Sequence, residues 1–313
     1  MLFIVFNRLD STRQVFARIR EARPAHLLIV ADGPRNDRPG EAAVCEKVLR
    51  TVLDGIDWPC RIDTDISTRN LGCGRRIFSG LQWAFTLVES AIILEDDCVP
   101  APTFFPYCDQ MLERYRNEPS VMMVGGTNVS ATANRSSNQY LFSQHSLIWG
   151  WATWRRAIAG HSQEMGWWRR TVHPREVRQR ALNWKEVLFI IEWFDAHLHD
   201  PLRGWDCQWF AQLYLNRGLC VVPRANLISN VGLIGASTRH RNRNHLLPLG
   251  EMTFPLEDTP LVRDKAYDLE FVERARLFGG WIFGRIAAKA FRSPAGWLLR
   301  RLWHTISRRP RGR

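Results

Sequence analysis

The sequence has no long uninterrupted apolar segment. A bilayer-spanning helix needs about 18 or more uncharged apolar residues in a row, and the 313-residue chain contains no such run. The nearest candidate, 277–291, is interrupted by Arg285 and Lys289. The apolar residues 2–6 lack the basic leader of a signal peptide. The sequence therefore predicts neither a membrane span nor secretion, and we expect the protein in the cytoplasm.

Paired cysteine motifs are also missing. The seven cysteines are irregularly spaced, odd in number and contain no C-x-x-C pair. A disulfide framework is typical of secreted chains that carry an even set of cysteines at regular spacings. The pattern instead indicates reduced thiols, which is consistent with a cytosolic protein.

Acidic residues are absent from the C-terminal end. Residues 274–313 contain 11 Lys or Arg and no Asp or Glu, so that of the net charge of +12 only about +1 belongs to residues 1–273. The charge of the tail therefore does not indicate what the body of the protein binds, and we expect no nucleic-acid partner. Bulky apolar residues alternate with the arginines, which is typical of amphipathic helices on an anionic membrane surface. RNA binding or an ordinary helix covering the sheet are the alternatives.

The body of the sequence alternates short apolar runs with amphipathic helical patterns. Hydrophobic residues make up 45% and charged residues 24% of the chain, as in ordinary globular domains. The patterns predict strands at 2–6, 27–30, 60–64, 91–97, 121–124 and 219–223, and helices at 11–22 (capped by Ser11 and Thr12), 41–52, 77–88, 104–115 and 206–216. Strands separated by helices form βαβ units, so we predict an α/β, Rossmann-like fold with a mixed, mostly parallel sheet flanked by helices. We place this domain at 1–250, a linker at 251–267 and a basic amphipathic helical tail at 268–313.

An acidic triplet follows one of the apolar runs. Residues 91–94 lead into Glu95, Asp96 and Asp97, which indicates a buried strand that reaches the surface at its carboxyl end. Open α/β sheets bind their ligands at that edge. Three adjacent carboxylates repel one another, and a hard divalent cation is the partner that suits them. The alternative is a solvated acidic turn, closed by the prolines that follow.

Two further segments lie at the same predicted edge. Asp32 follows the strand at 27–30, so a parallel sheet would place it beside the acidic triplet, although Asp-Gly-Pro is most often only a turn. The loop 67–76 carries three arginines and leads into the helix at 77–88. Helix N-termini and guanidinium groups both bind anions, so this loop is a candidate site for an anionic ligand. A helix cap with solvated arginines is the alternative.

Tryptophans and one more acid occur later in the chain. Trp149, Trp151 and Trp154 lie within six residues and cannot share one face of a helix or strand, so we expect at least one near the surface. A half-exposed indole beside a carboxylate site can stack on a sugar ring, whereas burial in the core is the alternative. Asp206 opens the helix at 206–216, where its carboxylate serves either as a cap or in catalysis.

Taken in order, these segments resemble a nucleotide-sugar-dependent glycosyltransferase of the GT-A fold. The resemblance is to bacterial family 2-like glycosyltransferases, some described as haemolytic-protein-like, and more distantly to N-acetylglucosaminyltransferase I. It covers roughly residues 2–245 and is carried by segments 6–8, 32–33, 70–73, 92–97, 104–105, 149–154, 205–209 and 226–230.

The resemblance implies roles for individual acids. Asp97 would ligate Mn²⁺ or Mg²⁺, while Glu95 and Asp96 would contact the ribose and the sugar. Asp32 would accept a hydrogen bond from the nucleotide base, which favours uracil. Asp206 would be the catalytic base.

The resemblance also implies a donor site and a second metal ligand. His240 would ligate the metal, although the family's Ala-Thr-His pattern is replaced here by Ala-Ser-Thr-Arg-His. The nucleotide-sugar donor would further contact Phe6, Asn7, Arg8, Arg69, Asn70, Trp149, Gly150 and Trp151.

The sequence therefore predicts a metal-dependent, inverting glycosyltransferase. It would move a hexosyl or N-acetylhexosaminyl group from a UDP-sugar to an envelope glycan or lipid-linked acceptor in polysaccharide biosynthesis. The basic tail would hold it as a peripheral protein on the inner face of the membrane. A glycoside hydrolase also uses paired carboxylates but needs no metal-binding triplet. The remaining alternative is a membrane-associating, haemolysin-like protein whose transferase body is inactive or secondary.

Overall fold

The computed structural model describes residues 1–130, 138–163, 168, 174–199, 205–233 and 247–278. The predicted metal ligand His240 and residues 279–313 of the predicted tail lie outside these ranges. Within the described ranges, none of the helices has the length and apolar content to cross a bilayer.

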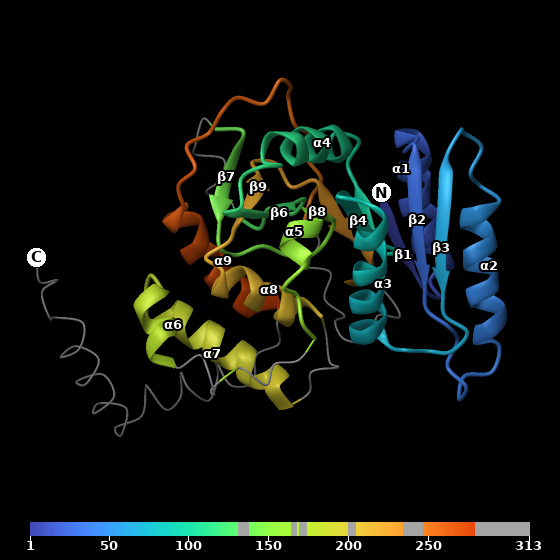
Figure 1. The fold of residues 1–313 in the computed structure, drawn as a ribbon, viewed down its shortest axis with the longest axis horizontal. Helices are drawn as coiled ribbons and strands as arrows, with labels where there is room; N and C mark the ends of the chain where they lie inside the picture. The colour runs from blue at the N-terminus through green and yellow to red at the C-terminus, as the bar shows by residue number, and fades with distance from the viewer. Residues whose placement is uncertain (131–137, 164–167, 169–173, 200–204, 234–246, 279–313) are drawn as a thin grey trace, which may run out of the picture.

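An eight-stranded mixed sheet forms the centre of the molecule, in the order β3-β2-β1-β4-β8-β6-β9-β7 (Figure 1). Its N-terminal half, from β3 to β4, is wholly parallel, and β8 then runs antiparallel to both of its neighbours. The strands are β1 (Leu2–Val5), β2 (His26–Ala31), β3 (Arg61–Ile66), β4 (Ser90–Glu95), β6 (Val121–Gly125), β7 (Tyr140–Ser143), β8 (Trp151–Trp154) and β9 (Leu219–Pro223). A separate antiparallel pair joins β5 (Cys98–Pro100) to β10 (Ile228–Asn230).

Helices cover both faces of the sheet. Successive residues of a strand point to opposite faces, so each strand contributes side chains to the packing on both sides. Phe3 and Val5 pack with α1, α2 and α4 on one face. Leu2 and Ile4 pack with α3 and the later helices on the other. The helices are α1 (Leu9–Ala22), α2 (Glu41–Leu53), α3 (Cys73–Leu87), α4 (Phe104–Arg114), α5 (Arg155–Ile158), α6 (Pro174–Arg180), α7 (Trp184–His199), α8 (Asp206–Leu215) and α9 (Lys265–Phe278). This arrangement confirms the predicted α/β class with a mixed, mostly parallel sheet flanked by helices.

The start of α1 differs from the prediction. The helix begins at Leu9, with Arg8 at the N-cap position and no side chain capping it. The hydroxyl groups of Thr12 and Ser11 instead donate to the carbonyl oxygen of Arg8, at 2.6 and 3.3 Å. The predicted cap was therefore wrong, because both hydroxyls lie inside the first turn and bond back to its opening carbonyl.

The four strands β5, β7, β8 and β10 did not follow from the sequence patterns. They are only three or four residues long, and β8 consists of Trp and small residues without apolar-polar alternation. Such short segments become strands through their partners, since β-propensity depends strongly on tertiary context.

Helix α9 belongs to the packed body of the protein. Tyr267, Phe271 and Val272 are buried in the same core as α3 and α8. Asp268, also buried, bonds Ser143 of β7 and the side chain of Arg263. The domain limits proposed from the sequence stay a prediction, and α9 crosses the limit placed between 267 and 268.

Candidate functional site

A cavity of about 980 Å³ opens at the carboxyl ends of β1, β2 and β4. The strand register explains its position, because Val5 pairs with Ala31 and Ile4 with Glu95. The polar residues that follow these strands are therefore brought to one edge, as parallel pairing requires. The polar side chains that line the cavity include Asn7, Arg8, Asp32, Arg35, Asn70, Arg76, Glu95, Asp96 and Asp97.

Two carboxylates of the acidic triplet converge on one guanidinium nitrogen. Nη1 of Arg8 donates to Oδ1 of Asp96 at 3.0 Å and to Oδ2 of Asp97 at 2.6 Å. The backbone N–H of Phe6 donates to the other oxygen of Asp96, at 3.1 Å. The Asp96 and Asp97 side chains are only 6% and 12% exposed, whereas that of Arg8 is 41% exposed. The acids are thus fixed in the wall, and the arginine reaches them from the cavity.

The acidic cluster carries more negative charge than Arg8 neutralises. Burial, reinforced by the charge of Asp97, raises the pKa of Asp96 to about 6 against the opposing effect of Arg8. The pKa of Glu95 is raised well above its ordinary value, first by burial and then by Asp97 and Asp96, with a smaller contribution from Asp206. Carboxylates this close cannot all ionise without a further cation.

Asp32 holds two loops together at the neighbouring strand end. Its Oδ1 accepts from the N–H groups of Gly33 and Leu71, both at 2.9 Å, and its Oδ2 accepts from Gly72 N–H and the Asn70 amide, both at 3.0 Å. An ionised carboxylate has about four acceptor positions, and these four donors fill them. The role of Asp32 toward a nucleotide base stays a prediction, and its observed contacts shape the loop that follows β3.

Gly33 allows these two loops to approach closely. A side-chain carbon at this position would lie 2.5 Å from backbone atoms of Arg69. The Arg69 carbonyl also accepts a hydrogen bond from Ser67, at 2.7 Å. The side chain of Arg69 does not line the cavity, although the adjacent Asn70 and Gly72 do.

Three residues, Glu41, Arg35 and Arg76, organise this side of the cavity. Arg35 and Arg76 line it, and Arg76 belongs to the loop 67–76 that the sequence indicated as a candidate anion site. Glu41 accepts hydrogen bonds from the side chain and backbone N–H of Arg35 and from the Asn7 amide, the last at 2.8 Å. Hydrogen bonding from Arg35 lowers the pKa of Glu41 to about 2. The Arg35 guanidinium lies over the Phe6 ring, 5.6 Å from its centroid.

Arg76 is the third of these residues, and it is buried. Its guanidinium donates to the carbonyl oxygen of Ala31 at 3.1 Å and to the carboxylate of Asp65 at 2.8 Å. These bonds tie α3 to the ends of β2 and β3. Arg75, one position earlier, is exposed.

The tryptophan segment 149–154 does not line the cavity. Trp151 is only 1% exposed, and its ring lies 5.5 and 5.1 Å from those of Trp205 and Trp209. Trp149 is half-buried, which confirms that one tryptophan of the group lies nearer the surface. Gly150 has a φ of +58°, and a side chain there would collide with Ile228. None of residues 149–151 lines the cavity described above.

Asp206 stands at the first position of α8, where the helix dipole favours a carboxylate. It is partly exposed and does not line the cavity. It lies close enough to Glu95 for its charge to raise the pKa of that carboxyl. The role of Asp206 as a base stays a prediction.

The chemistry of the site fits a hard divalent cation. Oxygen atoms of Asp96 and Asp97 converge on a single positively charged atom, and Mg²⁺ is commonly held by one or two carboxylates together with substrate phosphates. In the described part of the chain, no group of three or more His, Cys, Asp or Glu side chains could hold a metal by itself. Among the described residues, the carboxylates whose oxygen atoms converge here are those of Asp96 and Asp97.

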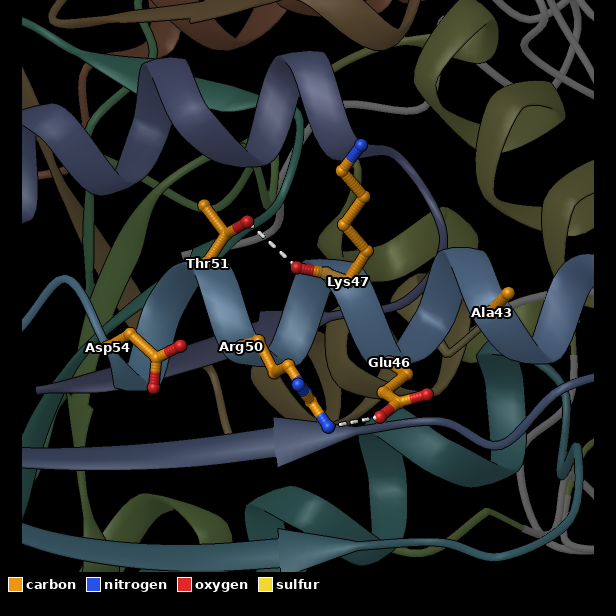
Figure 2. Close-up of a pocket in the computed structure, with 6 residues that line it drawn as sticks. All are labelled: Ala43, Glu46, Lys47, Arg50, Thr51 and Asp54. Carbon is orange, nitrogen blue, oxygen red and sulfur yellow. Dashed lines mark hydrogen bonds and ion pairs between the residues drawn. The ribbon is translucent and has the colours of Figure 1, made fainter.

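A second hollow, of about 410 Å³, lies on the outer face of α2 (Figure 2). Figure 2 shows that two of its charged side chains, Arg50 and Glu46, pair within the helix, at 2.7 Å. Thr51 likewise bonds the Lys47 carbonyl at 2.8 Å. Such i,i+4 contacts are ordinary on a solvated helix face, and no residue of the predicted site lies here.

No protein-family model matches the sequence, and no curated protein matches it. Among solved structures, apo UDP-glucose pyrophosphorylase is 11% identical with a TM-score of 0.35, covering 74% of this chain and 93% of its own. Apo mouse xyloside xylosyltransferase 1 is 11% identical with a TM-score of 0.30, covering 68% of this chain and 80% of its own. A putative glucose-1-phosphate thymidylyltransferase from Bacillus anthracis is 7% identical with a TM-score of 0.30, over 51% of this chain and 74% of its own. Similarities at this level do not establish a family.

Proposed function

We propose that this protein is a metal-dependent glycosyltransferase that binds a nucleotide-diphosphate sugar in the cavity at the ends of β1, β2 and β4. The observation that carries the proposal is the convergence of two buried carboxylates, Asp96 and Asp97, on one cationic atom in the cavity wall. A cavity of about 980 Å³ accommodates a ligand of nucleotide-sugar size. The resemblance of the ordered motifs supports a UDP-sugar as donor.

Asp96 and Asp97 would hold Mn²⁺ or Mg²⁺ against the donor diphosphate. When bound, the ion stabilises the negative charge that develops on the leaving diphosphate. On the protein side, Arg8 and Arg35 line the same cavity and add two guanidinium groups that can contact phosphate oxygens. The loop organised by Asp32 also borders the cavity, through Asn70 and Gly72.

Asp206 would act as the general base. It would accept the proton of an acceptor hydroxyl while that oxygen bonds to the anomeric carbon and the carbon–diphosphate bond breaks, with the electron pair leaving on the diphosphate. A single displacement of this kind inverts the anomeric configuration. The acceptor that we propose is an envelope glycan or a lipid-linked sugar, in line with the basic composition of residues 279–313.

Thermal unfolding with nucleotides tests the donor site directly. We expect UDP with Mn²⁺ to raise the melting temperature, and UDP without metal, GDP, CMP and dTDP to raise it much less. A ligand at about 100 times its dissociation constant stabilises a protein by roughly 2.7 kcal/mol, which is easily measured. No shift with any nucleotide, with or without metal, would contradict the proposal.

The same assay separates binding from chemistry. Asp206→Asn should keep the UDP–Mn²⁺ shift while donor turnover falls by about 10²–10⁴-fold, the usual contribution of a general base. Asp54→Asn, an exposed position after α2, removes the same charge away from the site and should change neither quantity. Full turnover by Asp206→Asn would show that another group takes the proton.

A further inference from the structure

Arg8 occupies the position at which a metal ion would bind. Its Nη1 atom lies 3.0 Å from Asp96 Oδ1 and 2.6 Å from Asp97 Oδ2, where the two carboxylates point together. A divalent cation lies about 2.1–2.5 Å from its oxygen ligands. The guanidinium group and the ion would therefore overlap in space, and their positive charges would repel each other. The site can hold one of the two cations at a time.

We propose that Arg8 is an exchangeable internal cation: it pairs with Asp96 and Asp97 in the free protein, and it moves to the donor diphosphate when a divalent ion takes its place. The destination of the arginine rests on the proposed function. The exchange at the two aspartates does not, because it can be measured with metal alone.

The backbone of Arg8 is fixed, so only its side chain needs to move. The carbonyl oxygen of Arg8 accepts from the backbone N–H of Thr12 at 2.9 Å and from the Thr12 hydroxyl at 2.6 Å. The side chain, by contrast, lines the open cavity and is 41% exposed. A long side chain on an anchored residue can change partners by rotamer changes, without rearranging the helix.

The carboxylates stay in place when the arginine leaves. Asp96 is held by the Phe6 N–H through the oxygen that Arg8 does not contact. Asp97 packs against Gly232, where a side chain would collide with Oδ2, and its carbonyl accepts from Val231 N–H at 2.9 Å. The contact of Asp96 comes from the end of β1 and those of Asp97 from the segment after β10, so the acids remain oriented toward the cavity whichever cation they bind.

Charge balance gives the exchange its direction. Arg8 is the cation in contact with Asp96 and Asp97, and Glu95 adds a third carboxyl group to the same cavity wall. A divalent ion adds one more positive charge and approaches more closely, so it is the better partner for the acids. The displaced guanidinium then needs an anion, and a diphosphate provides oxygens that suit its geometry.

Two consequences follow for binding. Metal alone should bind the free protein weakly, because it must displace Arg8. Metal and nucleotide diphosphate should each strengthen the binding of the other, because the diphosphate stabilises the displaced arginine and thermodynamic coupling is reciprocal. A fixed metal site that never contains the arginine would show no such penalty for metal alone.

The test measures Mn²⁺ binding to the full-length protein without nucleotide. Binding is recorded as the loss of the free Mn²⁺ signal in electron paramagnetic resonance. Arg8→Gln removes the competing charge and should lower the Mn²⁺ dissociation constant by about tenfold, within the usual range of coupling between sites. Arg8→Lys keeps the charge and should stay within about threefold of the wild type on the same reasoning. Arg13→Gln removes an equal charge from an exposed position on α1 and should leave the affinity unchanged.

An unchanged or weaker Mn²⁺ affinity in Arg8→Gln would overturn the proposal, as would the absence of Mn²⁺ binding to both proteins. The wild type supplies a test that does not depend on the folding of a variant, since saturating UDP should tighten Mn²⁺ binding by about tenfold. Tighter Mn²⁺ binding in Arg8→Gln, together with no UDP binding to either protein, would support the exchange and refute the donor site. The two proposals therefore fail separately.

Discussion

At the scale of single residues, the contacts of the charged groups distinguish binding positions from structural ones. Asp96 and Asp97 both pair with Arg8, whose side chain is exposed, so another cation can replace this arginine. Asp32 has its acceptor positions filled by four donors of the protein itself. Glu41 is likewise committed to Arg35 and Asn7. Acidic residues that look alike in the sequence therefore differ in whether their carboxylates can bind a ligand.

Glu41 should make stability depend on pH in acid. Its pKa falls from 4.5 to about 2 in the folded protein, chiefly through hydrogen bonding from Arg35. A carboxyl whose pKa is lowered by folding contributes stability that is fully present above its unfolded value and is lost as the pH falls through the folded value. We expect the difference in unfolding free energy between wild type and Glu41→Gln to be constant above about pH 5 and to shrink steadily below pH 4.5.

Urea denaturation at several pH values measures this difference. Glu46→Gln is a suitable control, because Glu46 lies on the same helix in an exposed pair with Arg50 and should change stability by less than about 0.5 kcal/mol at every pH. If the gap between wild type and Glu41→Gln at about pH 3 equals that at pH 6, the lowered pKa is wrong.

At the scale of elements, buried polar contacts connect the second half of the sheet to its helices. His145 follows β7 and bonds Glu186 of α7 at 2.7 Å. Arg263 bonds the same glutamate at 2.6 Å and also Asp268 of α9. Breaking one member of such a buried set leaves the other charges unpaired. This network fixes α7 and α9 against β7, and it explains why the chain after residue 263 remains part of the body.

The entry into β8 depends on a glycine, which gives a prediction at this scale. Gly150 combines a φ of +58° with little space for a side chain, because a side-chain carbon there would collide with Ile228 and would lie 3.3 Å from Leu94. Gly150→Ala should lower the free energy of unfolding by about 1–3 kcal/mol through overpacking, in addition to the cost of the backbone conformation.

Gly40 provides the matched comparison. It precedes α2 with a φ of +82°, and nothing lies within 4 Å of a side chain placed there. Gly40→Ala therefore meets the backbone penalty alone, and chemical denaturation should show it to be clearly less destabilised than Gly150→Ala. Equal losses for the two variants would mean that packing around Gly150 is looser than its neighbours imply.

At the scale of the whole molecule, the basic charge is concentrated at the C-terminal end of the sequence. Residues 279–313 contain nine Lys or Arg and no acid. Each basic residue near an anionic membrane contributes about 1 kcal/mol to binding, and salt screens this attraction. The packing of α9 shows where the chain must be cut to test the tail, since a cut at 267 would remove the buried Asp268, Phe271 and Val272.

We therefore expect a chain of residues 1–278 to unfold like the full-length protein but to lose binding to vesicles that contain anionic lipids. Full-length protein should sediment with such vesicles at low salt and dissociate from them as salt is raised. Vesicles of neutral lipid serve as the control. Retention of vesicle binding by the shortened chain would place the membrane contact on the body instead.

The local patterns of the sequence were sufficient for the fold class and for the edge on which the site lies. Apolar runs that end in Asp32 and in Glu95 become neighbouring parallel strands, and strand ends on one edge bring their polar residues together. These features depend on short stretches of chain and on the general geometry of parallel sheets. Phe6, Asn7 and Asn70, which the resemblance assigned to the donor, also line this cavity, and their contacts with a donor stay a prediction.

The tertiary structure alone decided which groups are paired. Arg8 meets Asp96 and Asp97 across 88 and 89 residues of sequence, and Glu41 meets Asn7 across 34. The packing of Trp151 between two tryptophans of the α8 region likewise depends on where β8 inserts into the sheet. Composition and periodicity report on residues a few positions apart. Contacts over longer separations are set by how the elements dock, so the sequence determined the acids, and the fold determined which cation they hold.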